Sequence, residues 1–153
     1  MAKRPVLLDY PPVWLAGCLA LAWVQAGLLP ATLPARPWFA LIGAALIAVG
    51  LALMVAAAWE MRRHRTTIVP HRDADALVTT GVFALSRNPI YLGDLLVLAG
   101  FCLRWGAWPS LVVLVPALAV VLRRRFIEPE EARLAARFGA TFHSYKNAIR
   151  RWI

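Results

Sequence analysis

The residues best suited to chemistry gather in one short segment of the chain, residues 86–94. The guanidinium of Arg87 offers a planar fork that fits a carboxylate. Pro89 is typical of the first helical turn, and a helix N-terminus offers free N–H groups to an anion. Gly93 would leave room for a ligand to approach the backbone. The segment therefore predicts either an anion-binding site or an interfacial anchor, in which Arg87 binds a lipid phosphate and Tyr91 joins an aromatic belt.

Asp94 lies about one turn inside the apolar run that follows Pro89. A carboxylate at the centre of a membrane span costs roughly 2.5–3.5 kcal/mol, although this one is expected to be shallow. Such a group usually has a partner or a role in the chemistry. Two interpretations stay open at this point, a salt bridge to a nearby arginine and a part in catalysis.

A second polar cluster follows a run of three arginines. Its acids are Glu128, Glu130 and Glu131. Acids at the start of a helix complement its dipole, and they could also pair with the arginines before them. Alternatively, one of them could bind the hydroxyl groups or an amine of a ligand.

Several familiar sites are missing from the pattern. The histidines have no metal-ligand spacing, so we expect no metal; they are His64, His71 and His143. The chain contains neither a phosphate-binding loop nor the glycine-rich turn of a dinucleotide-binding domain. A soluble Rossmann-type site is therefore excluded as far as sequence can exclude it.

Four apolar runs must position these groups. Hydrophobic residues make up 61% of the 153 residues, more than is usual in a soluble domain, and they are concentrated in runs. The pattern predicts an all-α polytopic membrane protein with one domain over residues 1–153. Its four transmembrane helices are expected at about 13–29, 38–59, 89–104 and 107–122, and its cytoplasmic tail at 123–153. Within that tail, residues 128–137 predict an amphipathic helix with Pro129 near its start and Gly139 after its end.

The basic residues predict the orientation. The formal net charge is +9, and the arginines flank the apolar runs instead of alternating with aromatic residues, so we expect no nucleic-acid partner. Of the 17 lysines and arginines, all but Arg36 and Arg104 fall on one side of the expected membrane. By the positive-inside rule that side is cytoplasmic, and both termini lie there. Contact with membrane lipids follows, and the Ala-, Leu- and Arg-rich composition suggests a bacterial inner membrane.

Two blocks in the C-terminal half of the chain carry a resemblance to a known family. The first block is LVTTGVFALSRNPIYLG, residues 77–93. The second begins at Glu130–Glu131 and continues through Leu134, Phe138, Gly139, Phe142 and Tyr145 to Arg151 and Trp152. Both resemble the signature of the isoprenylcysteine carboxyl methyltransferase and phospholipid methyltransferase superfamily, whose members are integral membrane methyltransferases.

The resemblance implies a cytosol-facing pocket for S-adenosyl-L-methionine, built from the ends of the last spans and the C-terminal tail. It implies that the cofactor-binding residues are Arg87, Asn88, Tyr91, Gly93, Glu130 and Glu131. We expect Arg87, Asn88 and Asp94 to take part in catalysis. Eukaryotic carboxyl methyltransferases carry histidine where this chain has Asn88; asparagine still donates a hydrogen bond but does not titrate near neutrality.

The resemblance predicts an S-adenosylmethionine-dependent membrane methyltransferase with a lipid-like or amphiphilic small molecule as its acceptor. A carboxylate acceptor needs no base, whereas an amine must lose a proton, which Asp94 or a C-terminal glutamate could take. Two other classes stay open. A small four-helix exporter would need a carboxylate deep in one of the first two runs, where Gln25 is the only strongly polar residue. A non-catalytic or reductase-like relative would bind a nicotinamide cofactor.

Overall fold

The computed structural model describes residues 10–29, 37–66 and 75–153. The described residues form helices and no strand, which confirms the all-α prediction for them. In chain order the elements are α1 (Pro11–Leu28), α2 (Pro37–Arg63), η2 (Gly81–Ala84), α3 (Pro89–Trp105), α4 (Trp108–Leu122), η3 (Arg123–Ile127) and α5 (Glu128–Ala148). Residues outside these ranges include Lys3, Arg4, Arg36, His71 and Arg72, on which part of the orientation argument rests.

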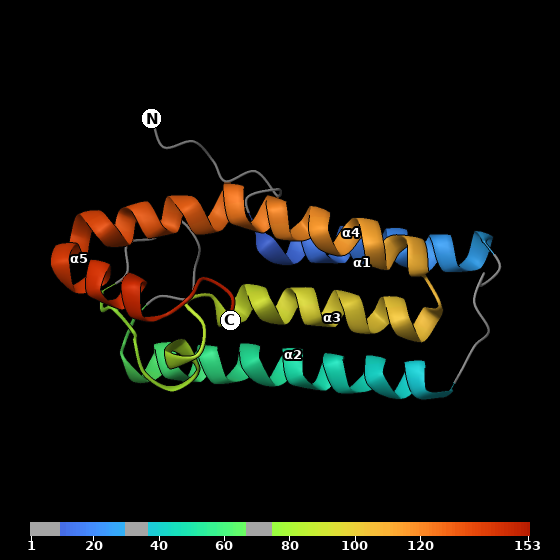
Figure 1. The fold of residues 1–153 in the computed structure, drawn as a ribbon, viewed down its shortest axis with the longest axis horizontal. Helices are drawn as coiled ribbons and strands as arrows, with labels where there is room; N and C mark the ends of the chain where they lie inside the picture. The colour runs from blue at the N-terminus through green and yellow to red at the C-terminus, as the bar shows by residue number, and fades with distance from the viewer. Residues whose placement is uncertain (1–9, 30–36, 67–74) are drawn as a thin grey trace.

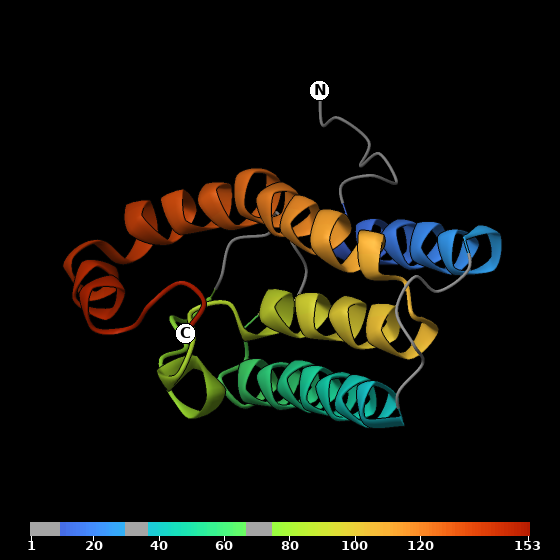
Figure 2. The same ribbon diagram turned by 45° about the vertical axis from the view of Figure 1, so that its right-hand side comes forward.

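The four apolar helices lie side by side, and each runs in the opposite direction to the one before it in the chain (Figure 1). The helix α3 lies between α2 on one side and the pair α1 and α4 on the other, and a turned view shows the same order (Figure 2). Each begins and ends within a few residues of its expected span, because a long apolar run with flanking charges is a strong local signal. The core lies between α3, α4 and α1, around Leu98, Leu118, Leu122 and Phe126.

Two glycine pairs bring α2 and α3 into backbone contact. Gly43 faces Gly100, and Gly50 faces Gly93, so each helix carries its glycines seven residues apart. A Cβ added at Gly100 would lie 2.5 Å from the carbonyl oxygen of Gly43, and one at Gly50 would lie 2.8 Å from that of Gly93. Small residues that let helix backbones approach are typical of packing between helices in membranes.

A polar pair joins α1 to the start of α4. The side-chain oxygen of Gln25 accepts hydrogen bonds from the backbone N–H of Ser110 at 3.0 Å and from its hydroxyl at 2.7 Å. The N–H groups in the first turn of a helix lack partners within the helix, so Gln25 satisfies one of them. The one strongly polar residue inside the first two expected spans is therefore accounted for by the packing of α1 against α4.

The helix α4 continues into α5 instead of ending at Leu122, which corrects the predicted C-terminal region. The arginines 123–125 lie in η3, a π-helical turn in which the N–H of Glu128 donates to the carbonyl of Arg123. A proline inside a helix removes one hydrogen bond and crowds an earlier carbonyl, and the wider π turn just before Pro129 relieves that crowding. The three glutamates are therefore not at a free helix start, and the dipole interpretation of them is wrong.

Gly139 does interrupt the C-terminal helix, as expected, but it does not end the helical region. Its backbone has φ 48° and ψ −122°, a conformation that favours glycine, and it lies at a sharp bend within α5. Beyond it the chain continues as helix to Ala148, which the sequence did not predict. The bend turns this last part of α5 back toward the start of α3 (Figure 1).

Two of the helices in the described part of the chain, α1 and α2, are long and apolar enough to cross a membrane. The helices α3 and α4 have 17 and 15 residues, short of the roughly 20 that a span needs. Large apolar side chains are exposed on the outer faces of α1, α2 and α4, including Leu21, Trp23, Leu41, Val55, Trp59, Val112 and Val113. Such extended apolar surface fits a lipid environment, and the crossing of α3 and α4 remains a prediction.

Candidate functional site

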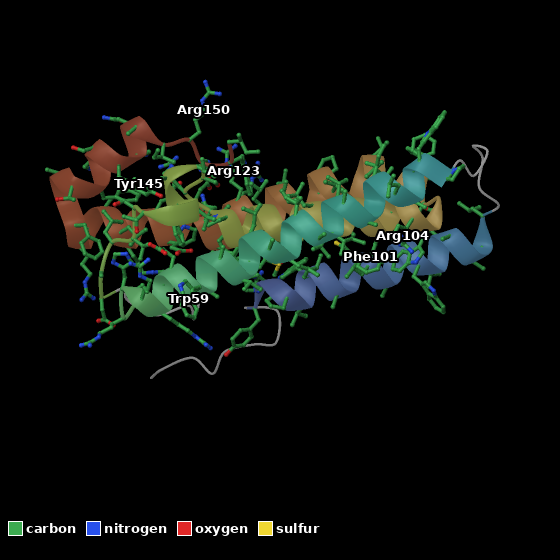
Figure 3. The ribbon with its side chains drawn as sticks, turned by 90° about the horizontal axis from the view of Figure 1, so that it is seen from below. Trp59, Phe101, Arg104, Arg123, Tyr145 and Arg150 are labelled. Atoms are coloured by element: carbon green, nitrogen blue, oxygen red, sulfur yellow. The ribbon has the colours of Figure 1, made fainter. Side chains whose placement is uncertain are left out.

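Three segments that are far apart in the sequence meet where α3 begins. They are the loop 85–88 before α3, the first half of α5 and the C-terminal residues 149–153, and the chain ends beside α3 (Figures 1 and 2). Arg123, Tyr145 and Arg150 lie toward this end of the bundle, whereas Arg104 lies at the opposite end (Figure 3). We refer to this region as the α3 entry site.

Arg87 is the buried cation of the α3 entry site. Its side chain is only 9% exposed, and its Nη2 lies 3.4 Å from a carboxylate oxygen of Glu131. Its Nε and Nη1 atoms are buried and have no hydrogen-bond partner among the described residues. An unsatisfied buried donor costs free energy, so these two nitrogens are well placed for an acceptor that the described residues do not supply.

Glu131 is shared between two arginines. Arg151 donates from Nε at 3.1 Å and from Nη2 at 2.7 Å to the two oxygens of Glu131, whereas Arg87 makes a longer contact with one of them. The hydrogen bond to Glu131 raises the pKa of the Arg151 guanidinium. The structure thus brings Arg87 and Glu131, two of the predicted cofactor-binding residues, into direct contact with each other.

Asn88 joins the loop before α3 to the C-terminal residues. Its side-chain amide donates to the carbonyl oxygen of Arg151 at 3.0 Å, and the hydroxyl of Ser86 donates to the same oxygen at 3.3 Å. The backbone N–H of Arg87 donates to the carbonyl of Arg150 at 3.1 Å. These bonds use Asn88 as a neutral donor, for which asparagine serves without any need to titrate.

Tyr91 lies on the first turn of α3 and contacts α5. Its side chain is buried, and its hydroxyl donates to a carboxylate oxygen of Glu130 at 3.2 Å. Two of the predicted cofactor-binding residues, one from each sequence block, are therefore in contact. The aromatic-belt interpretation, which needs an exposed ring at the membrane surface, does not fit this burial.

Asp94 is 2% exposed. No cation lies within ion-pair distance of its carboxylate in the described part of the chain, so the salt-bridge interpretation has no support there. Buried charges are normally paired. Asp94 therefore stays a candidate for a role in the chemistry.

Gly93 does not offer its open side to a ligand. A Cβ there would lie 2.5 Å from the side chain of Met54 and 2.7 Å from the carbonyl oxygen of Gly50. Its missing side chain is needed for the close approach of α2, so the predicted reason for including it in a ligand pocket is wrong. Its position still matters, since it fixes α3 against α2 next to Asp94.

Sequence reasoning missed a second polar cluster, at the end of α2. Glu60 is 8% exposed and accepts a hydrogen bond from the hydroxyl of Thr80, which is also 3.0 Å from the ring of His64. This cluster holds the loop before α3 to the end of α2. A glutamate directly after an apolar run, followed by basic residues, was a signal that could have identified it.

Tyr145 ties the second half of α5 to the same loop. Its hydroxyl donates to the carbonyl of Phe83 at 2.7 Å, and burial raises the pKa of Tyr145 to about 12. The hydroxyl therefore stays a donor at any physiological pH. It is one of the positions of the second sequence block, and its contact explains why a tyrosine suits that position here.

The α3 entry site combines two guanidinium groups with one shared carboxylate, and two buried donors remain open. Such a set suits an anionic group, above all a carboxylate. Among the residues that the structure describes, no group of three His, Cys, Asp or Glu side chains could hold a metal ion. The site geometry favours binding of a small anionic ligand over metal chemistry.

Comparison with known proteins gives this geometry a context. Residues 38–141 match the family of phospholipid methyltransferases, a stretch that includes all but the first residue of α2, the whole of α3 and α4, and all the predicted site residues. No curated protein matches the chain. The match covers well over half of the sequence and agrees with the resemblance of the two blocks, so this chain belongs to the phospholipid methyltransferase family.

Proposed function

We propose that the protein is an integral membrane methyltransferase that takes its methyl group from S-adenosyl-L-methionine and transfers it to a lipid-like acceptor. Membership of the phospholipid methyltransferase family supports the reaction class. The observation that carries the proposal is Arg87, a buried arginine with two donors left unpaired in the matched region. An arginine in that state fits a ligand carboxylate, and S-adenosylmethionine has one.

The charge balance of the site supports this fit. Three arginines, Arg87, Arg123 and Arg151, carry three positive charges, and the two glutamates that they contact, Glu128 and Glu131, carry two negative charges. One excess positive charge remains beside the unpaired donors, and hydrogen bonds to a charged acceptor are the stronger ones. When bound, S-adenosylmethionine supplies an electrophilic methyl group on its sulfonium.

In this proposal the residues of the chain bind and orient. Arg87 holds the carboxylate of the cofactor, and Glu131 keeps Arg87 and Arg151 in place. Asn88 fixes the C-terminal residues over the site, and Tyr91 with Glu130 forms the wall toward α5. Holding two reactants in the right geometry supplies much of the rate of such a transfer.

The acceptor is proposed to enter sideways from the lipid, and the cofactor from the cytosol. This requires four membrane-spanning helices with both termini cytoplasmic, as the distribution of lysine and arginine predicts. The Ala-, Leu- and Arg-rich composition suggests that the membrane is a bacterial inner membrane. For an amine acceptor, Asp94 is the carboxylate that we assign to take the proton, because it is buried within α3 and has no cation as a partner among the residues that the structure describes. A carboxylate acceptor would not use it.

The test compares two cofactors on the purified protein in detergent. Calorimetry should show binding of S-adenosylmethionine and none of NADPH, and the membrane fraction should transfer a labelled methyl group into extractable lipid. Binding of NADPH alone would favour a reductase-like relative. Binding of neither cofactor would overturn the proposal.

A further inference from the structure

Arg151 and Arg87 compete for the two carboxylate oxygens of Glu131. It takes both carboxylate oxygens, at 3.1 and 2.7 Å, while Arg87 reaches one oxygen at 3.4 Å. A third contact places Nη1 of Arg151 3.8 Å from Glu128. The arrangement is unequal, because the more exposed arginine holds the carboxylate more closely than the buried one does.

The backbone around Arg151 is held as firmly as its side chain. Its carbonyl oxygen accepts from Ser86 and Asn88, and the neighbouring carbonyl of Arg150 accepts from the N–H of Arg87. Next in the chain, Trp152 packs against the core cluster between α3 and α4. The segment 149–153 is thus a strap across the start of α3, fixed at three successive residues.

Removal of Arg151 would change the environment of Arg87. A guanidinium and a carboxylate form two parallel hydrogen bonds when nothing competes for either. Without Arg151, the carboxylate of Glu131 would be free to take Arg87 in that way and so to occupy its donors. The open donors of Arg87 therefore depend on the occupation of Glu131 by Arg151.

We infer that Arg151 is a positioning residue, which holds Glu131 through the C-terminal strap so that Arg87 stays open for the carboxylate of a ligand. This inference rests on the proposed function, because it takes S-adenosylmethionine as that ligand. Arg151 itself does not touch the ligand carboxylate in this account. Its effect is on selectivity for ligands that carry a carboxylate.

The experiment uses two ligands that differ only in that group, S-adenosylmethionine and its decarboxylated form. Calorimetry on the full-length protein in detergent should show tighter binding of S-adenosylmethionine to the wild type, by about tenfold to a hundredfold. In Arg151→Gln most of this preference should be lost, while binding of the decarboxylated form changes little. If the role of Arg151 were purely structural, the substitution would lower the affinity for both ligands by the same factor.

A second substitution makes the mechanism specific. The double variant Arg151→Gln with Glu131→Gln should regain the preference, because an amide cannot hold Arg87 as a carboxylate does. If Arg151→Gln does not fold, Arg151→Lys takes its place, and its single ammonium group should give an intermediate preference. Arg124→Gln, an exposed arginine of η3, is the matched control and should behave as wild type.

The outcomes separate this inference from the proposed function. If the wild type binds neither ligand, the proposed function fails. If the wild type prefers S-adenosylmethionine and the Arg151 variants keep the full preference, or lose affinity for both ligands equally, the positioning role is overturned and the proposed function stands.

Discussion

The two ends of α3 solve different physical problems. Along its face toward α2, α3 is packed through paired glycines, with a potential Cβ only 2.5 to 2.8 Å from the opposite backbone. At its start, α3 lies among buried polar groups, and Arg87 retains two unpaired donors. The glycine contact is closely packed, whereas the polar groups at the start of α3 are not all hydrogen-bonded. The comparison indicates that the closely packed pair α2 and α3 supports a site in which two nitrogens of Arg87 have no hydrogen-bond partner and can bind a ligand.

The largest effect should come from disturbing the packed region. Gly100→Val would press a branched side chain onto the backbone of α2, so we expect a loss of about 3 kcal/mol or more in the free energy of unfolding. Thermal unfolding in detergent would measure it. Gly17→Val on α1 is the control, because nothing lies within 4 Å of a Cβ there, and it should change stability little. Equal losses in both variants would contradict the account of the α2–α3 contact.

Glu131→Ala should affect both stability and ligand binding. It removes the partner of two arginines, of which Arg151 makes charge-assisted hydrogen bonds worth roughly 1.5–3 kcal/mol and Arg87 makes a longer contact. The free energy of unfolding should fall by an amount of this order, and affinity for S-adenosylmethionine should fall as well. An unchanged unfolding midpoint would show that the ion pairs with Arg87 and Arg151 are not formed in the folded protein.

The smallest change in stability should come from Asp94→Asn, and its sign should be favourable. The substitution replaces a buried carboxyl group, which has no cation within ion-pair distance among the described residues, with an amide of the same shape, so we expect a gain of about 1 kcal/mol or less. Cofactor affinity should stay as in the wild type, whereas methyl transfer to an amine acceptor should be lost. A destabilised variant would indicate that the charge of Asp94 is needed for the fold.

Much of the helical framework could be predicted from sequence, because apolar runs and flanking charges are local signals. The proximity of Arg87 and Glu131 could also be predicted, since the expected spans place both residues at the same end of the helix bundle. The sequence could not predict that Arg151 is the arginine closest to Glu131. Many basic residues lie at that end of the bundle, and only the path of residues 149–153 brings Arg151 there. The packing of Gly93 against α2 was not predicted either. The spacing of seven residues between Gly43 and Gly50 and between Gly93 and Gly100 was a signal that could have indicated it.

The continuous helix from α4 to α5 shows another limit. Pro129 after three arginines is typical of a new helix, and the sequence gives no sign that a π turn keeps the old one going. The error concerned three glutamates whose predicted role at a helix start was wrong. Their contacts with Tyr91, Arg87, Arg123 and Arg151 come from their position on a helix that leaves the bundle and returns.

The most direct test of the account is the affinity of Arg87→Ala for S-adenosylmethionine, measured by calorimetry beside Arg62→Ala. Arg62 is exposed near the end of α2, so its loss should leave binding unchanged. Arg87→Ala should bind about tenfold to a hundredfold more weakly, with only a small change in the unfolding midpoint, since Glu131 keeps Arg151 as its closer partner. Wild-type affinity in well-folded Arg87→Ala would contradict the assignment of Arg87 as the carboxylate-binding residue of this site.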